Sequence, residues 1–177
     1  QKKMNNYAAA SSYFRQAIDL DPLYAEAYGN LGILDFQQGM YDLAESNFSI
    51  ALEIDPEMPE VHFNYGLLLM EIENYEEAEK AFDRALNGLY NNSAVHYHMG
   101  VVQLRLEKYE DAAESFDNAV NIKPDFYDAL LNLGVARYHL GQYAEALEAL
   151  NRAKDIKQNE FQLFWYLARN EVELGNW

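Results

Sequence analysis

The sequence predicts an all-α protein built as an α-solenoid, in which antiparallel helix pairs are stacked side by side. Two observations predict this fold. One pattern of large, small and turn-forming residues recurs every 34 residues, and each period has room for two helices separated by turn residues. Four complete repeats, with 24 residues before them and 17 from the last start onward, account for the 177 residues. The repeat starts are Ala25, Pro59, Ser93, Tyr127 and Phe161.

The first helix of each repeat is expected to bury positions 4, 7 and 8, counting the first residue of a repeat as position 1. Positions 4 and 7 hold mostly large residues, such as Tyr28 and Leu31, and position 8 holds a small one. Glycine inside a helix costs about 0.5–1 kcal/mol relative to alanine, so its recurrence at position 8 indicates a close approach between two helices. We expect it to face the alanine at position 20 of the second helix. The residues at position 8 are Gly32, Gly66, Gly100, Gly134 and Ala168.

The second helix is expected to bury an aromatic residue at position 17, a large residue at position 24 and an alanine at position 27. Between the two helices, Gly39 and Gly141 occupy position 15, where a residue that tolerates a left-handed backbone allows the first helix to end. In three repeats a proline, which lacks an N–H, ends the second helix at position 32. These prolines are Pro22, Pro56 and Pro124.

In these residues the chain resembles the tetratricopeptide repeat family, whose repeat is an antiparallel helix pair of 34 residues. The resemblance implies a right-handed superhelix whose first helices line a concave face. The pattern departs from the family at position 11, where an aromatic residue is common. The resemblance is carried by Tyr28-Gly29-Asn30-Leu31-Gly32, Tyr41, Ala44, Phe48, Ala51 and Pro56. Position 11 instead holds Asp35, Leu69, Gln103, Arg137 and Glu171.

This register predicts half repeats at both ends of the chain. Residues 1–24 correspond to a second helix and residues 161–177 to a first helix, whereas the complete repeats are 25–58, 59–92, 93–126 and 127–160. A repeat array normally finishes in a capping element with a polar outer face. The last helix instead carries Phe161, Phe164, Trp165 and Tyr166, so we expect a stretch of a longer protein, with frayed natural termini as the alternative.

The composition argues against several classes of partner. The chain has 13 Lys and Arg against 29 Asp and Glu, a net charge of −16, whereas nucleic acids and anionic membranes attract basic surfaces. No run of apolar residues approaches the length of a membrane span. Without cysteine there is no disulfide, thiol nucleophile or thiolate metal site. We expect neither nucleic-acid binding nor membrane insertion; the compartment is left open, with the cytoplasm favoured.

Position 6 of the first helix carries a column of polar side chains that should face the concave groove. A side-chain amide both donates to and accepts from a peptide unit, so a column of amides can hold an extended peptide by its backbone. The column is similar to the asparagines in the repeat superhelix of O-linked N-acetylglucosamine transferase. The alternative is that these amides bond locally between helices. The column consists of Asn30, Asn64, His98 and Asn132.

Apolar and acidic side chains flank this column. The apolar ones would form pockets for a partner's side chains, or would complete the packing between neighbouring first helices. They are Ile33, Phe63, Leu67, Tyr97, Val101, Leu131, Val135 and Trp165. The acidic ones, at position 2, are Glu26, Glu60 and Asp128. Residues 1–79 carry a net charge of −12 and residues 80–177 one of −4, which favours a basic partner segment for the N-terminal half, unless the acidity only keeps the surface solvated.

No residue pattern indicates catalysis, a metal or a cofactor. His96 and His98 would project about 200° apart on a helix, and neither a phosphate-binding glycine loop nor a nucleophile elbow is present. Chaperone-binding members of the family grip a C-terminal carboxylate with Lys and Arg in the groove. Binding of Hsp70 or Hsp90 tails is disfavoured because the corresponding positions here lack those residues. They hold Gly29, Asn30, Ile33, Asn64, Ala94 and His98.

The sequence therefore predicts a protein–protein interaction module that is not itself an enzyme and binds an extended, basic peptide segment in its concave groove. Two alternatives stay open. The chain could be the substrate-recognition arm of a larger enzyme, such as a glycosyltransferase, or a scaffold that self-associates through exposed repeat ends.

Overall fold

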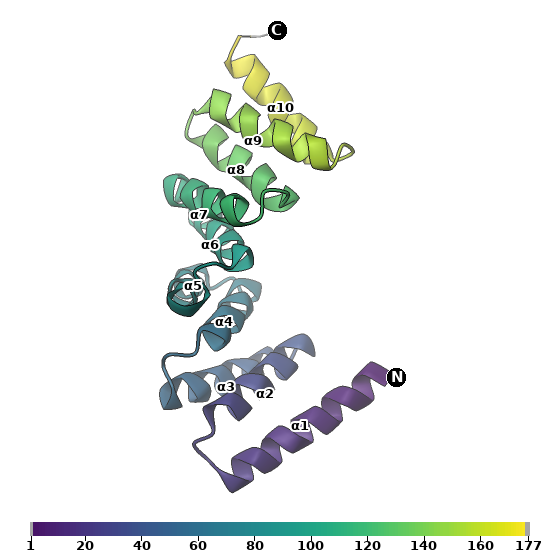
Figure 1. Ribbon diagram of the computed structural model, residues 1–177, viewed down its shortest axis with the longest axis vertical. Helices are drawn as coiled ribbons and strands as arrows, with labels where there is room; N and C mark the ends of the chain where they lie inside the picture. The colour runs from purple at the N-terminus through teal and green to yellow at the C-terminus, as the bar shows by residue number, and fades with distance from the viewer. Residues whose placement is uncertain (1, 176–177) are drawn as a thin grey trace. The chain divides into compact units, whose positions relative to one another are not determined.

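The computed structural model describes residues 2–175, with side chains from residue 7 onward, and these residues form ten α-helices (Figure 1). Residue 1 of the predicted N-terminal half repeat and residues 176–177 of the predicted C-terminal half repeat lie outside the described part. The all-α class and the antiparallel pairing of helices are confirmed. The helices are α1 (Lys2–Leu20), α2 (Ala25–Gln37), α3 (Tyr41–Ile54), α4 (Pro59–Glu71), α5 (Tyr75–Leu89), α6 (Ser93–Arg105), α7 (Tyr109–Ile122), α8 (Tyr127–His139), α9 (Tyr143–Ile156) and α10 (Phe161–Glu173).

The helices follow the 34-residue period. The first helices α2, α4, α6, α8 and α10 begin at the residues where the repeats start, and the second helices α3, α5, α7 and α9 begin at the position-17 tyrosine. The chain divides into two compact units, an N-terminal unit of residues 1–89 and a C-terminal unit of residues 90–177. Each is described by itself below.

Within each unit the first helices lie closer together than the second helices. Helix α2 contacts α4 in the N-terminal unit, and α8 contacts both α6 and α10 in the C-terminal unit. Among the described residues, α3 does not contact α5 and α7 does not contact α9. Since the more closely spaced layer of a stack lies on the inside of its curve, the first helices form the concave side of each unit.

The position-8 glycines make room for a large side chain from the second helix, and at Gly134 an added Cβ would also lie 3.3 Å from the carbonyl oxygen of Ala146, the position-20 alanine. A Cβ atom on Gly66 would lie 2.6 Å from a ring carbon of Phe82, and one on Gly134 would lie 2.5 Å from Cγ of Leu150. Phe82 and Leu150 are fully buried. The sequence did not indicate the position-24 side chain as the nearest neighbour of the glycine; this side chain reaches across the helix pair and fills the space above it.

The turn inside each repeat uses a left-handed residue at position 15. Gly39 and Gly141 have φ of +73° and +72°, as the sequence suggested, and Glu73 and Glu107 adopt the same conformation with φ of 61° and 58°. The following N–H bonds back to the position-11 carbonyl, for example from Lys108 at 2.8 Å. This pattern of bonds ends a helix with a Schellman turn, which glycine accepts without strain and glutamate does not.

Position 11, where the chain departs from its family, is buried in the first three complete repeats and forms polar pairs across two of the helix hairpins. Asn47 Nδ2 donates to Asp35 Oδ2 at 2.8 Å, and Ser115 Oγ donates to Gln103 Oε1 at 2.7 Å. These bonds satisfy side chains that would otherwise be costly to bury, so polar residues replace the aromatic ring without disrupting the hairpin.

Replacing Gly66 with alanine should lower the free energy of unfolding by about 1–3 kcal/mol, because the added methyl group overlaps the Phe82 ring. In a Phe82→Ala background the same change should cost much less, since the ring is gone and alanine favours the helix. Urea denaturation of the four proteins of this double-mutant cycle measures both costs. Equal costs in the two backgrounds would contradict the steric explanation.

Replacing Glu107 with glycine should raise the free energy of unfolding by roughly 0.5–1 kcal/mol, because a left-handed backbone strains every residue that has a Cβ. The matched change Gly141→Glu, at the same position of the next repeat, should lower it by a similar amount. Thermal denaturation compares the two, and a lower Tm for Glu107→Gly would rule out strain at this turn.

Candidate functional site

The concave side of the N-terminal unit carries two asparagines held in the same way. Asn30 Nδ2 donates to the Glu26 carbonyl oxygen at 2.7 Å, and Asn64 Nδ2 donates to the Glu60 carbonyl oxygen at 2.7 Å. Each bond reaches back one helical turn and fixes the orientation of the amide. Among the described residues neither amide has another partner, so each keeps a carbonyl oxygen and one N–H for a ligand.

The apolar and acidic side chains predicted beside these two amides lie on the same two helices, α2 and α4. Ile33, Phe63 and Leu67 are half-buried, so part of each is accessible from the surface. Phe63 also packs on Phe82, with ring centroids 5.9 Å apart. The side chains of Glu26 and Glu60 are exposed on the same two helices. The face therefore combines amides, apolar surface and negative charge.

In the C-terminal unit the position-6 side chains are arranged differently. Asn132 of α8 interacts with the Tyr97 hydroxyl of α6 and lowers its pKa. Burial and the negative charge of Asp128, itself exposed, raise the pKa of Tyr97, and the interaction with Asn132 works in the opposite direction. His98 is half-buried beside the Tyr97 ring, and burial lowers the pKa of its imidazole.

Two residues of the predicted apolar set belong to the core. Leu131 and Val135 are only 8% exposed, so they are not available to a peptide, and their assignment to a binding pocket was wrong. The physical reason is that α8 lies between α6 and α10, and its side chains are covered from both sides. Tyr97 and Val101 are half-buried and pack on the same core, whereas Trp165 on α10 is 43% exposed.

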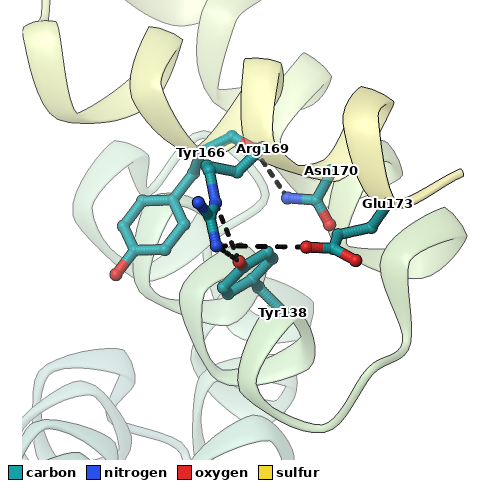
Figure 2. A network of polar contacts seen from close by, with 5 residues as sticks. All are labelled: Tyr138, Tyr166, Arg169, Asn170 and Glu173. Carbon is teal, nitrogen blue, oxygen red and sulfur yellow. Dashed lines mark hydrogen bonds and ion pairs between the residues drawn. The ribbon is translucent and has the colours of Figure 1, made fainter. Parts of the chain in front are cut away.

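A cluster at the α8–α10 contact was not recognised in the sequence (Figure 2). Arg169 donates to the Tyr138 hydroxyl oxygen from Nε at 3.0 Å and from Nη2 at 2.8 Å, and its guanidinium carbon lies 5.5 Å from the Trp165 ring centroid. Tyr166 packs edge-on against both neighbouring rings, and burial raises the pKa of its hydroxyl. The sequence did contain one indication that this helix differs from the others. Arg169 occupies position 9, which holds an aliphatic residue in each of the four complete repeats.

The buried histidines have a structural role. His62 Nε2 donates to the Pro56 carbonyl oxygen and His96 Nε2 donates to the Tyr90 carbonyl oxygen, each at 2.8 Å. Both bonds connect position 4 of a first helix to the end of the preceding repeat. Within the described residues, no cluster of three or more His, Asp or Glu side chains is arranged to hold a metal ion, and no helix is long and apolar enough to cross a membrane.

Two sequence models, both described as tetratricopeptide repeat, match the chain. One covers residues 1–45 and 97–160, and the other covers residues 35–99. The chain belongs to the tetratricopeptide repeat family. Tetratricopeptide repeats form protein-interaction modules, and neither matching model describes an enzyme. No curated protein matches the sequence at a significant level.

Several solved tetratricopeptide repeat structures share the fold. YrrB, described as having an unusual peptide-binding site, matches with a TM-score of 0.82 and 24% identity over 93% of this chain and 84% of its own. PilF of Pseudomonas aeruginosa matches with a TM-score of 0.80 and 23% identity over 98% and 79% of the two chains. MamA of Desulfovibrio magneticus matches with 0.78 and 18% over 89% and 90%. Identities this low support the fold alone.

His98 should make the folded repeats less stable in mild acid. Burial lowers the pKa of His98 from its ordinary 6.5, so as the pH falls the unfolded chain binds a proton before the folded chain does. The neutral imidazole therefore contributes its full stability above pH 6.5, and this contribution is lost as the pH falls toward the lower pKa of the folded state. In His98→Gln this loss should be smaller. Urea denaturation at about pH 7.5 and about pH 5.5 measures the difference. The exposed His139 provides the control variant His139→Gln, and an identical loss in His98→Gln and the unmodified chain would refute the assignment.

Proposed function

We propose that the concave face of the N-terminal unit binds an extended, basic peptide segment by its backbone. The observation that carries this proposal is the matched pair of amides: Asn30 and Asn64 make the same 2.7 Å bond one repeat apart. Because each amide already has its orientation fixed, little side-chain entropy is lost when a ligand binds to it.

The free groups of the two amides suit a peptide backbone. Each amide keeps one acceptor and one donor, and an extended peptide presents carbonyl oxygens and N–H groups in alternation. Bonds to the backbone are independent of the peptide's side chains, so the two asparagines would provide affinity without strong sequence preference. Selectivity would then come from the side chains beside them.

Two features favour a basic segment with apolar residues. Glu26 and Glu60 are exposed on the same helices as the amides, and residues 1–89 carry 16 acidic and 5 basic side chains, a net charge of −11. Such a charge speeds the approach of a cationic segment. The half-buried Ile33 and Leu67 offer apolar surface for alternate side chains of the peptide. The peptide-binding site described for YrrB, which shares the fold, supports a peptide ligand by analogy.

The double replacement Asn30→Ala with Asn64→Ala should weaken binding of a fluorescent (Lys-Val)4 peptide by about 1 kcal/mol per lost hydrogen bond, which corresponds to roughly a 5-fold to 30-fold rise in Kd. Fluorescence anisotropy at low salt measures this. Asn132→Ala is the matched control, because that amide occupies the same position of a repeat in the other unit. Equal affinities of the double variant and the control would exclude the amide pair as the binding site.

Charge is tested separately with Glu26→Gln and Glu60→Gln. These changes should slow association with (Lys-Val)4, and added salt should reduce the difference from the unmodified chain. A (Glu-Val)4 peptide should not bind. If the acidic peptide bound as well as the basic one, a basic segment would be excluded as the preferred ligand.

A further inference from the structure

A polar pocket of the N-terminal unit lies apart from the amide pair. It has a volume of about 250 Å³ and is bounded by the loop between α3 and α4, the first turn of α4 and the last turns of α5. His62, which lines the pocket, and Asn64, which belongs to the amide pair, project about 200° apart on α4. The pocket is therefore a separate site, at the junction of the first two complete repeats and away from both ends of the chain.

Gly88 distinguishes this pocket from the corresponding places in the other repeats. It occupies position 30, which is an isoleucine in the other three complete repeats. A Cβ atom on Gly88 would lie 2.2 Å from Cγ of Pro59, so the proline ring packs directly on the backbone of α5. Together with Pro56, this ring gives the pocket an apolar wall. The isoleucines at position 30 are Ile54, Ile122 and Ile156.

His62 supplies a buried acceptor at the pocket. The residue is 4% exposed, and its Nε2 donates to the Pro56 carbonyl oxygen at 2.8 Å. A neutral imidazole that donates from Nε2 accepts at Nδ1. Among the described residues Nδ1 has no hydrogen-bond partner, and it is not sealed from solvent. An N–H group of a ligand in the pocket can therefore bind at this atom.

Two exposed side chains of opposite charge line the same pocket without an ion-pair partner. They are Arg84 of α5 and Glu57 of the loop between α3 and α4. Within the described part of the chain neither forms an ion pair, with the other or with any third residue. By contrast, Lys80, one turn before Arg84, is paired with Glu77 at 2.7 Å. The pocket therefore offers one positive and one negative group to a ligand.

This arrangement suits a small zwitterion. A carboxylate accepts hydrogen bonds from the Arg84 guanidinium and the Asn87 amide, which also lines the pocket. An ammonium group donates to the Glu57 carboxylate and to His62 Nδ1. The volume is slightly below the roughly 300–1,000 Å³ of sites for drug-sized ligands, so the pocket accepts only a small molecule.

We propose that this pocket binds a free α-amino acid with an aliphatic side chain. Its carboxylate is held by Arg84 and Asn87, its ammonium group by Glu57 and His62, and its side chain lies against the proline rings. Each end of a peptide carries only one of the two charged groups, so the ligand is a free amino acid and not the terminus of a longer chain.

The test measures binding of L-leucine to the full chain by heteronuclear NMR, in which the backbone amide signals of Asn87 and Gly88 report on the pocket. Two analogues each lack one charge: L-leucinamide has no carboxylate, and isocaproate has no ammonium group. Leucine should bind with a Kd in the millimolar range. Both analogues should bind about threefold to fivefold more weakly, which is the effect of losing an exposed ion pair.

Single replacements assign each charge of the ligand to a side chain. Arg84→Gln should weaken leucine binding by the same factor and leave leucinamide binding unchanged, whereas Glu57→Gln should weaken leucine binding and leave isocaproate binding unchanged. Arg152→Gln and Asp125→Asn are the matched controls, because these exposed residues occupy the same repeat positions in the C-terminal unit. They should change none of the Kd values. Far-UV circular dichroism first establishes that each variant remains helical.

The outcomes separate this proposal from its alternatives. Unchanged Asn87 and Gly88 signals at tens of millimolar leucine would overturn it. Equal binding of isocaproate and leucine that depends on Arg84 alone would also overturn it, because the pocket would then be a simple anion site. The same would follow if Arg84→Gln weakened leucinamide as much as leucine. Loss of (Lys-Val)4 binding in Asn30→Ala with Asn64→Ala bears only on the concave face and leaves this result unaffected.

Discussion

The architecture depends on the close approach of two helices at one point in every repeat, where a glycine on the first helix receives a large side chain from the second. The ring of Phe48, Phe82 or Phe116 lies so close to its glycine that a methyl group would not fit between them. Protein interiors are packed too densely to absorb such an overlap. This contact sets the distance between the two helices of a pair.

That spacing decides which side chains are accessible on the concave side. Where a first helix has a neighbour on both sides, as α8 has, its position-5 and position-9 residues are covered and join the core. In α2 the position-9 residue Ile33 is half-buried, and in α10 the position-5 residue Trp165 is 43% exposed. One sequence position therefore serves packing in one repeat and surface chemistry in another.

The polar groups on the first helices of the two units differ in hydrogen-bonding character. In the N-terminal unit, Asn30 and Asn64 each offer one donor and one acceptor beside negative charge, which suits a complete peptide backbone of opposite charge. In the C-terminal unit, the Tyr138 hydroxyl oxygen accepts two bonds from Arg169, whose guanidinium lies over the Tyr138 and Trp165 rings.

The sequence by itself determined the repeat length, the helix pairs and the two glycine turns, because a 34-residue period repeats every local signal and tertiary contacts reinforce it. Only the tertiary structure decided which polar groups remain available. The sequence cannot show that Leu131 is covered from two sides or that Arg169 bonds a tyrosine 31 residues away. These contacts depend on side-chain rotamers and on the distances between helices. Both differ between repeats, even at positions that are equivalent in the 34-residue pattern.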